Sequence, residues 1–196
     1  MRNLLLATLA FSIFSACAQE DKPEIMPKDI QIKTALLPAP EDKQEGAMVY
    51  GYDEDGEIVV LREGTNDLVC LADNPYNKGI SVSCYFKELD PFMKRGRELK
   101  KEGKETMAVR KLRGEEVASG KLKMPEAPSM MYIFYGTEET YDKTNATLGD
   151  GQFRYVIYTP FATTESTGLP LKPHAKGMPW LMDPGTHRAH IMVGPN

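Results

Sequence analysis

The sequence predicts a single α+β domain, in which a mostly antiparallel sheet packs with two or three helices. Short segments rich in β-branched and aromatic residues are separated by Gly, Asp and Asn turns, which is typical of strands. Two charged segments carry apolar residues at helical spacing. A chain of 196 residues with 41% hydrophobic and 27% charged residues has the size and composition of one globular domain with a proper core.

The chain begins with a segment typical of a secretory signal peptide. Arg2 precedes an apolar run over residues 4–14, and small residues follow it. That run is shorter than the roughly 20 residues that span a bilayer. Ala18 ends an A-x-A cleavage site, whereas residues 14–17 resemble a lipobox in which Cys17 becomes the lipidated first residue. We expect residues 1–18 to direct export to the periplasm or, with a lipid at Cys17, to the outer membrane.

Residues 19–45 are expected to form a tether and a short helix. Residues 19–28 are polar and interrupted by prolines, and Asp29 is suited to cap a helix that Pro38 stops. Residues 38–46 resemble a linker. The globular domain is then predicted at residues 46–196.

Two strands follow, around the acidic stretch DEDG. Asp55-Gly56 suits a tight hairpin turn between AMVYGY and EIVVLR. DEDG lacks the alternating ligands and the distal glutamate of an EF-hand loop, so we interpret it as turn chemistry.

A second hairpin is predicted from NDLVCLADNPYNKGISVSCYFK. Pairing about a turn at Asn77 places Cys70 opposite Cys84 and Leu68 opposite Phe86, with the apolar residues of both strands on one face. Directly opposed strand residues lie within disulfide range, and an oxidising compartment favours the bond. We therefore predict a structural disulfide between Cys70 and Cys84.

Helices and further strands complete the domain. Asp90-Pro91 is an N-cap and first-turn signal for a helix that ends at Gly103, and a second helix is expected within residues 111–120. SMMYIFYG is apolar on both faces, which predicts an interior strand, and QFRYVIYTPF predicts another.

The C-terminal segment PWLMDPGTHRAHIMVGPN carries two of the three histidines. Asp183-Pro184 begins a turn between two predicted strands, the second of which contains His190. Residues three apart, such as His187 and His190, share a face on a helix but point to opposite faces on a strand, so an extended H-x-x-H could not bind one metal ion. A zinc site would need a third ligand, for which His174 and Asp183 are the candidates. We predict no metal site and no cofactor, and we retain His190, Asp183 and His174 as candidate catalytic residues because histidine titrates near neutral pH.

Several segments resemble a group of exported bacterial proteins with no known activity. They are LREGTNDLVCLAD, CYFKELDPFMKRGRELKKEGK, ASGKLKMP, PFATTESTGL and PWLMDPGTHRAHIM, which together cover most of the domain. The resemblance implies an exported single domain. In that group a proline often occupies the position of His187, which makes the H-x-x-H spacing incidental, whereas His190 keeps its place.

Two function classes stay open. A net charge of −4 does not favour a nucleic-acid partner, and neither H-E-x-x-H, G-x-S-x-G nor a Walker loop is present. We expect a non-catalytic cell-envelope binding module for a small molecule or an envelope protein. The alternative is a hydrolase-like or metal-assisted enzyme that uses His190 with Asp183, Glu165 or His174.

Overall fold

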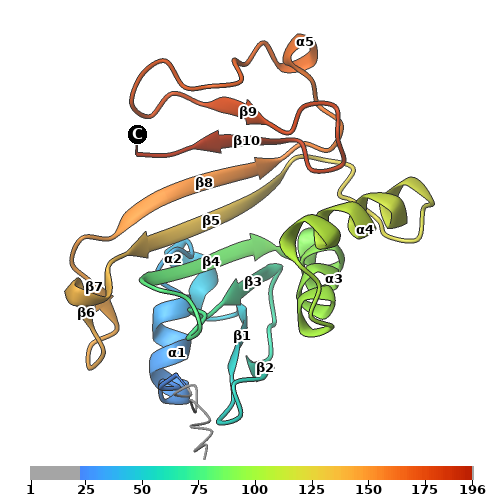
Figure 1. Cartoon of the computed structure of the whole chain (residues 1–196). Helices are drawn as coiled ribbons and strands as arrows, with labels where there is room; N and C mark the ends of the chain where they lie inside the picture. The colour runs from blue at the N-terminus through green and yellow to red at the C-terminus, as the bar shows by residue number, and fades with distance from the viewer. Residues whose placement is uncertain (1–22, 196) are drawn as a thin grey trace, which may run out of the picture.

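The computed structural model describes residues 23–195 and contains ten strands in that part of the chain. The large sheet is formed by β1 (Met48–Tyr52), β2 (Ile58–Arg62), β3 (Leu68–Leu71), β4 (Ile80–Phe86), β5 (Ser129–Gly136), β8 (Gln152–Tyr158), β9 (Trp180–Met182) and β10 (His190–Val193). Its strand order is β2-β1-β3-β4-β5-β8-β10-β9, and a separate small hairpin pairs β6 (Tyr141–Asp142) with β7 (Thr147–Leu148) (Figure 1). The signal peptide and the lipidation at Cys17 predicted above lie outside the described residues.

Within residues 23–195, three helices of at least two turns accompany the sheet, as the sequence predicts. They are α1 (Lys28–Ala35), α3 (Asp90–Lys101) and α4 (Thr106–Ala118), and two single turns, α2 (Glu41–Gln44) and α5 (Thr164–Thr167), lie in loops. The segment expected to be a linker therefore contains α2. Helix α4 begins five residues before the predicted start at residue 111. Gly103 follows α3 with a φ of 76°, the left-handed conformation expected of a helix terminus.

The predicted capping of two helices is wrong. Helix α1 begins directly after Pro27, so Asp29 lies inside the first turn and not at the N-cap. Asp90 is also inside its helix, because a 3₁₀ turn at Lys87–Leu89 runs straight into α3. Its carboxylate instead accepts hydrogen bonds from the Tyr85 hydroxyl (2.8 Å) and from Arg97 (3.1 Å).

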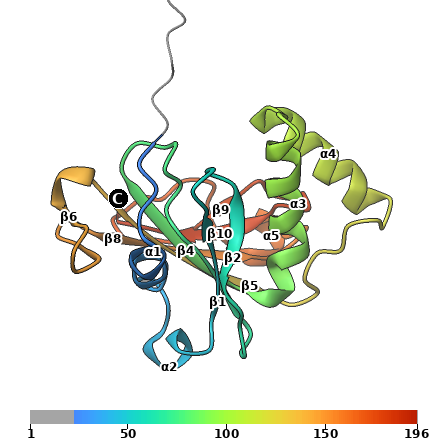
Figure 2. The same ribbon diagram turned by 90° about the horizontal axis from the view of Figure 1, so that it is seen from below.

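The two faces of the sheet are covered by different helices. The α1 face, which carries Val49, Leu68, Cys70 and Cys84, packs against Ala35 of α1, and all five residues are fully buried. The α3 face carries Val69 and Tyr85 and packs against Leu89 and Met93. Figure 2 shows α1 and the α3–α4 pair on opposite sides of the strands. Because α1 belongs to the core, the boundary predicted at residue 45 separates a helix from the strands that it covers.

The sheet is antiparallel except where β1 pairs with β3. The connection from β2 to β3 crosses the beginning of β1, and the amides of Thr65 and Asn66 both donate to the carbonyl oxygen of Gly46. A Cβ on Gly64 would lie 2.7 Å from the backbone nitrogen of Met48, so this crossing requires a glycine.

Across residues 23–195, every helix is too short or too polar to cross a bilayer. The described part of the chain is one α+β domain.

Candidate functional site

The predicted disulfide is confirmed, together with the strand register that predicted it. Strands β3 and β4 pair Cys70 with Cys84 and Leu68 with Phe86. The two cysteines are bonded, their Cα atoms lie 4.0 Å apart, and neither side chain is exposed. Such a bond is typical of compartments outside the reducing cytoplasm.

His190 begins β10 and is 9% exposed. Its Nδ1 lies 2.6 Å from the carbonyl oxygen of Arg188, and its ring lies 5.4 Å from the ring of Tyr158. Because a carbonyl oxygen only accepts, Nδ1 carries the proton of the neutral imidazole. Burial lowers the pKa of His190 and favours this neutral form. The contact that orients the ring is therefore a backbone carbonyl and not a carboxylate.

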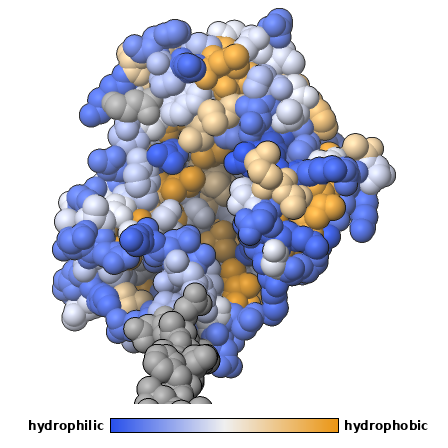
Figure 3. Space-filling model, viewed as in Figure 1, coloured by the Kyte–Doolittle hydropathy of each residue, from blue (hydrophilic) through white to orange (hydrophobic). Residues whose placement is uncertain are grey.

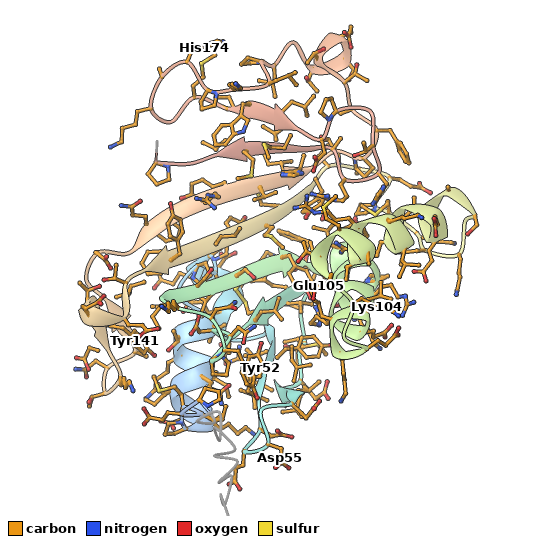
Figure 4. The ribbon with its side chains drawn as sticks, viewed as in Figure 1. Tyr52, Asp55, Lys104, Glu105, Tyr141 and His174 are labelled. Atoms are coloured by element: carbon orange, nitrogen blue, oxygen red, sulfur yellow. A yellow bond between two sulfur atoms is a disulfide. The ribbon has the colours of Figure 1, made fainter. Side chains whose placement is uncertain are left out.

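The other candidate residues have partners of their own. Asp183 accepts a hydrogen bond from Arg188 at 2.6 Å. His187 lies in the turn before β10, where its ring packs against the ring of Phe92 at a centroid distance of 5.8 Å, and burial lowers its pKa. His174 is exposed on the loop between α5 and β9, at the outer end of the molecule (Figure 4).

The structure therefore places Asp183 near His190 through Arg188, but it does not bring His174 to them. Glu165 lies in α5 and accepts a hydrogen bond from the neighbouring Thr164 hydroxyl. Among the described residues, no three His, Cys, Asp or Glu side chains gather in a way that could hold a metal ion.

A cavity of about 270 Å³ lies between α1, the β3–β4 connection and the β6–β7 hairpin. We call it the Asp73 pocket. Its lining includes Tyr52, Tyr141 and the carboxylates of Asp73, Glu138 and Glu24. Figure 4 shows Tyr52 on β1 and Tyr141 on the small hairpin, on either side of α1.

Asp73 is the half-buried acid of this pocket. One of its carboxylate oxygens accepts a hydrogen bond from the Ser81 amide at 2.7 Å, and no lysine, arginine or histidine among the described residues forms an ion pair with it. Burial raises the pKa of Asp73 to about 6, and the negative charge of Glu138 acts in the same direction. The pocket thus holds a carboxylate that lacks a cation.

The hydrogen bonds of the Thr34 and Tyr141 hydroxyl groups have defined donors and acceptors. Thr34 donates its only proton to the carbonyl oxygen of Ile30 at 2.8 Å, so in its contact with Tyr141 the tyrosine must be the donor. The oxygen of Tyr141 is then left as an acceptor. Gln31 is fully engaged, because its amide nitrogen donates to the carbonyls of Met26 and Tyr52 and its oxygen accepts from the Tyr52 amide.

Sequence reasoning missed this pocket. The sequence analysis places Asp73 in a hairpin strand without assigning it a role, and Tyr141 lies in a long loop far along the chain. The only local signal was an acidic residue at the end of an apolar strand. Comparison of the chain with protein-family models, curated proteins and solved structures finds no match.

Proposed function

We propose that this protein is a non-catalytic binding module of the bacterial cell envelope, and that its ligand is a small, positively charged amine held in the Asp73 pocket. The observation that carries the proposal is the half-buried carboxylate of Asp73, which lines the cavity without a cationic partner among the described residues. A buried carboxylate is stable in its charged form only when a cation or several hydrogen-bond donors face it. An ammonium group supplies both.

The other groups in the pocket favour the same class of ligand. The oxygen of Tyr141 can only accept, and Glu138 adds a second carboxylate beside Asp73. The one lysine of the lining, Lys143, is already paired with Glu24 at 2.6 Å. The lining thus offers acceptors and negative charge to a molecule that brings donors and positive charge.

The shape of the pocket supports a small ligand. Its volume of about 270 Å³ is at the lower end of the range for small-molecule sites. The rings of Tyr52 and Tyr141 provide aromatic walls, against which a cation or the alkyl part of an amine packs favourably.

The placement of the histidines supports binding over hydrolysis. His190 is held by a backbone carbonyl and Asp183 by Arg188, and His174 lies on a separate exposed loop. A hydrolytic site needs a base, its orienting group and a nucleophile within hydrogen-bond reach of one another.

Calorimetric titration at pH 7.5 with putrescine, ethanolamine, glycerol and succinate tests the proposal. We expect the two amines to bind, and glycerol and succinate to bind at least tenfold more weakly. Asp73→Asn should weaken amine binding at least tenfold. Asp55→Asn makes the same chemical change at the exposed tip of the β1–β2 hairpin and should have no effect (Figure 4).

Two results would contradict the amine site. One is equal binding of succinate and putrescine, and the other is undiminished amine binding by Asp73→Asn. Turnover of an ester or glycoside panel that His190→Ala abolishes, in a variant that keeps its fold, would instead support the enzymatic alternative.

A further inference from the structure

A second, larger hollow lies between the α3 face of the sheet and helices α3 and α4. Its volume is about 820 Å³, and we call it the basic groove. Figure 3 shows a hollow on this side of the molecule, with apolar residues inside it and polar residues on the rim. Among the described residues, a single carboxylate, that of Glu57, lines the groove, against six cationic side chains. These cations are Arg97, Lys100, Lys101, Arg110, Arg113 and Arg188.

Three of the six cations are neutralised inside the protein. The pairs are Arg97 with Asp90 (3.1 Å), Lys101 with Glu57, and Arg188 with Asp183 (2.6 Å). The other three, Lys100, Arg110 and Arg113, pair with no carboxylate among the described residues. The groove therefore holds positive charge that the described residues leave unbalanced.

Arg113 is the most constrained of these three. Its guanidinium lies 3.9 Å from the centre of the Phe92 ring, and its Nη1 donates to the Phe92 carbonyl oxygen at 3.1 Å. Its Nε is buried without an acceptor. Burial lowers the pKa of Arg113, and the positive charges of Arg188 and Arg110 lower it further. A guanidinium that is partly removed from water and faces other cations gains free energy when an anion reaches it.

The spacing along α4 aligns the unpaired cations. Thr106, Arg110 and Arg113 follow one another at intervals of four and three residues, so they share one side of the helix, and all three line the groove. Lys100 of α3 joins them, because its ammonium donates to the Thr106 hydroxyl at 3.0 Å. Val109 and Met93 add apolar surface to the lining.

We propose that the basic groove binds a phosphate monoester, with its phosphoryl oxygens on Arg113 and Arg110 and its organic part along Val109 and Met93. A phosphoryl group carries close to two negative charges, which matches more than one unpaired cation, and the exposed planar guanidinium of Arg110 can bind two of its oxygens at once. A carboxylate carries one charge and would leave most of the excess unbalanced. The groove borders the Asp73 pocket at Tyr52 and Ala72, which line both, but its unpaired cations lie on α3 and α4 and favour a ligand of opposite charge.

The experiment titrates the full mature protein, by NMR or calorimetry, with inorganic phosphate, glycerol 3-phosphate and acetate at one fixed ionic strength. We expect glycerol 3-phosphate to bind more tightly than phosphate, and acetate at least tenfold more weakly than either. Arg113→Gln and Arg110→Gln should each weaken binding of glycerol 3-phosphate at least fivefold. Arg110 is exposed, so its variant tests the groove even if Arg113→Gln fails to fold.

Lys111→Gln is the matched control. Lys111 is exposed on the same helix, pairs with Glu115 and does not line the groove, so its loss changes the net charge equally. Binding should survive this change within twofold. The proposal fails if the two phosphate ligands do not bind, if Lys111→Gln weakens binding as much as Arg110→Gln, or if acetate competes equally. Amine binding by the Asp73 pocket is measured in the same variants and should not change.

Discussion

The two halves of the large sheet are closed to different degrees. In the half built from β2, β1, β3 and β4, Val49, Leu68, Cys70 and Cys84 are fully buried under α1 and a disulfide joins β3 with β4, although Val60 of the edge strand β2 is 40% exposed. In the half built from β5, β8, β10 and β9, the strands carry mostly half-buried side chains, and Phe153 remains 41% exposed. We therefore expect substitutions under α1 to lower the free energy of unfolding more than substitutions on the partly exposed strands of the second half.

Removing the disulfide should have the largest effect. Cys70→Ala combined with Cys84→Ala opens a loop with a sequence separation of 14 and should lower the free energy of unfolding by about 3 kcal/mol, because the unfolded chain regains its freedom. Urea denaturation of the oxidised protein and of the variant measures this difference. A loss below about 1 kcal/mol would mean that packing, not the covalent bond, holds this half together.

Acidification should weaken binding at the proposed amine site. The pKa of Asp73 in the folded protein, about 6, exceeds its ordinary value of 3.8, so between these values the folded state holds the extra proton. Stability should therefore fall as the pH rises from about 4 to about 6, and amine affinity should rise about tenfold from pH 5 to pH 7.5 as the carboxylate ionises.

Asp73→Asn should remove the pH dependence of both stability and amine affinity, whereas Asp55→Asn should leave both pH dependences unchanged. Denaturation and titration at four pH values measure them. A variant Asp73→Asn with the pH profile of the unchanged protein would show that another group titrates.

Tyr85→Phe should cost about 1 kcal/mol. The buried Tyr85 hydroxyl donates to Asp90 at 2.8 Å and accepts from Arg97 at 2.9 Å, and both partners keep their mutual ion pair when it is lost. Chemical denaturation gives the value, and the near-ultraviolet circular dichroism spectrum checks that the fold is kept. No loss of stability would show that the hydroxyl only fills space.

Phe153→Ser tests the open half and should have the smallest effect, below about 1 kcal/mol. Phe153 packs on Phe134 at a centroid distance of 4.7 Å but keeps much of its surface in water. Urea denaturation of the variant and of the unchanged protein measures this loss of stability. A loss comparable to that of the disulfide would remove the distinction between the two halves.

Strands in both halves could be predicted from the sequence, and so could the local pairings of β3 with β4 and of β9 with β10. The pairing of Cys70 with Cys84 followed from side-chain alternation in two adjacent strands, which is local information. The parallel pairing of β1 with β3 did not follow, because it depends on a chain crossing at Gly64 that no periodicity encodes.

The same limit applies to the helix starts and to the sites. Asp90 has the residue type of a cap, but the preceding 3₁₀ turn moved the helix start. The surroundings of His187 come from Phe92 and Gly114, and those of Asp73 from Tyr141, all distant in sequence. Tertiary contacts between distant segments decide such environments, and a single sequence does not show them.

The Cys70–Cys84 bond closes a covalent ring that includes residues 71–83. Asp73, Pro75, Asn77 and Ile80, which form one wall of the Asp73 pocket, all lie within this ring. Cutting the bond would remove one covalent constraint on that wall, so the proposed amine binding would be thermodynamically linked to the redox state of the two cysteines. We expect reduction of the bond to weaken the proposed amine binding.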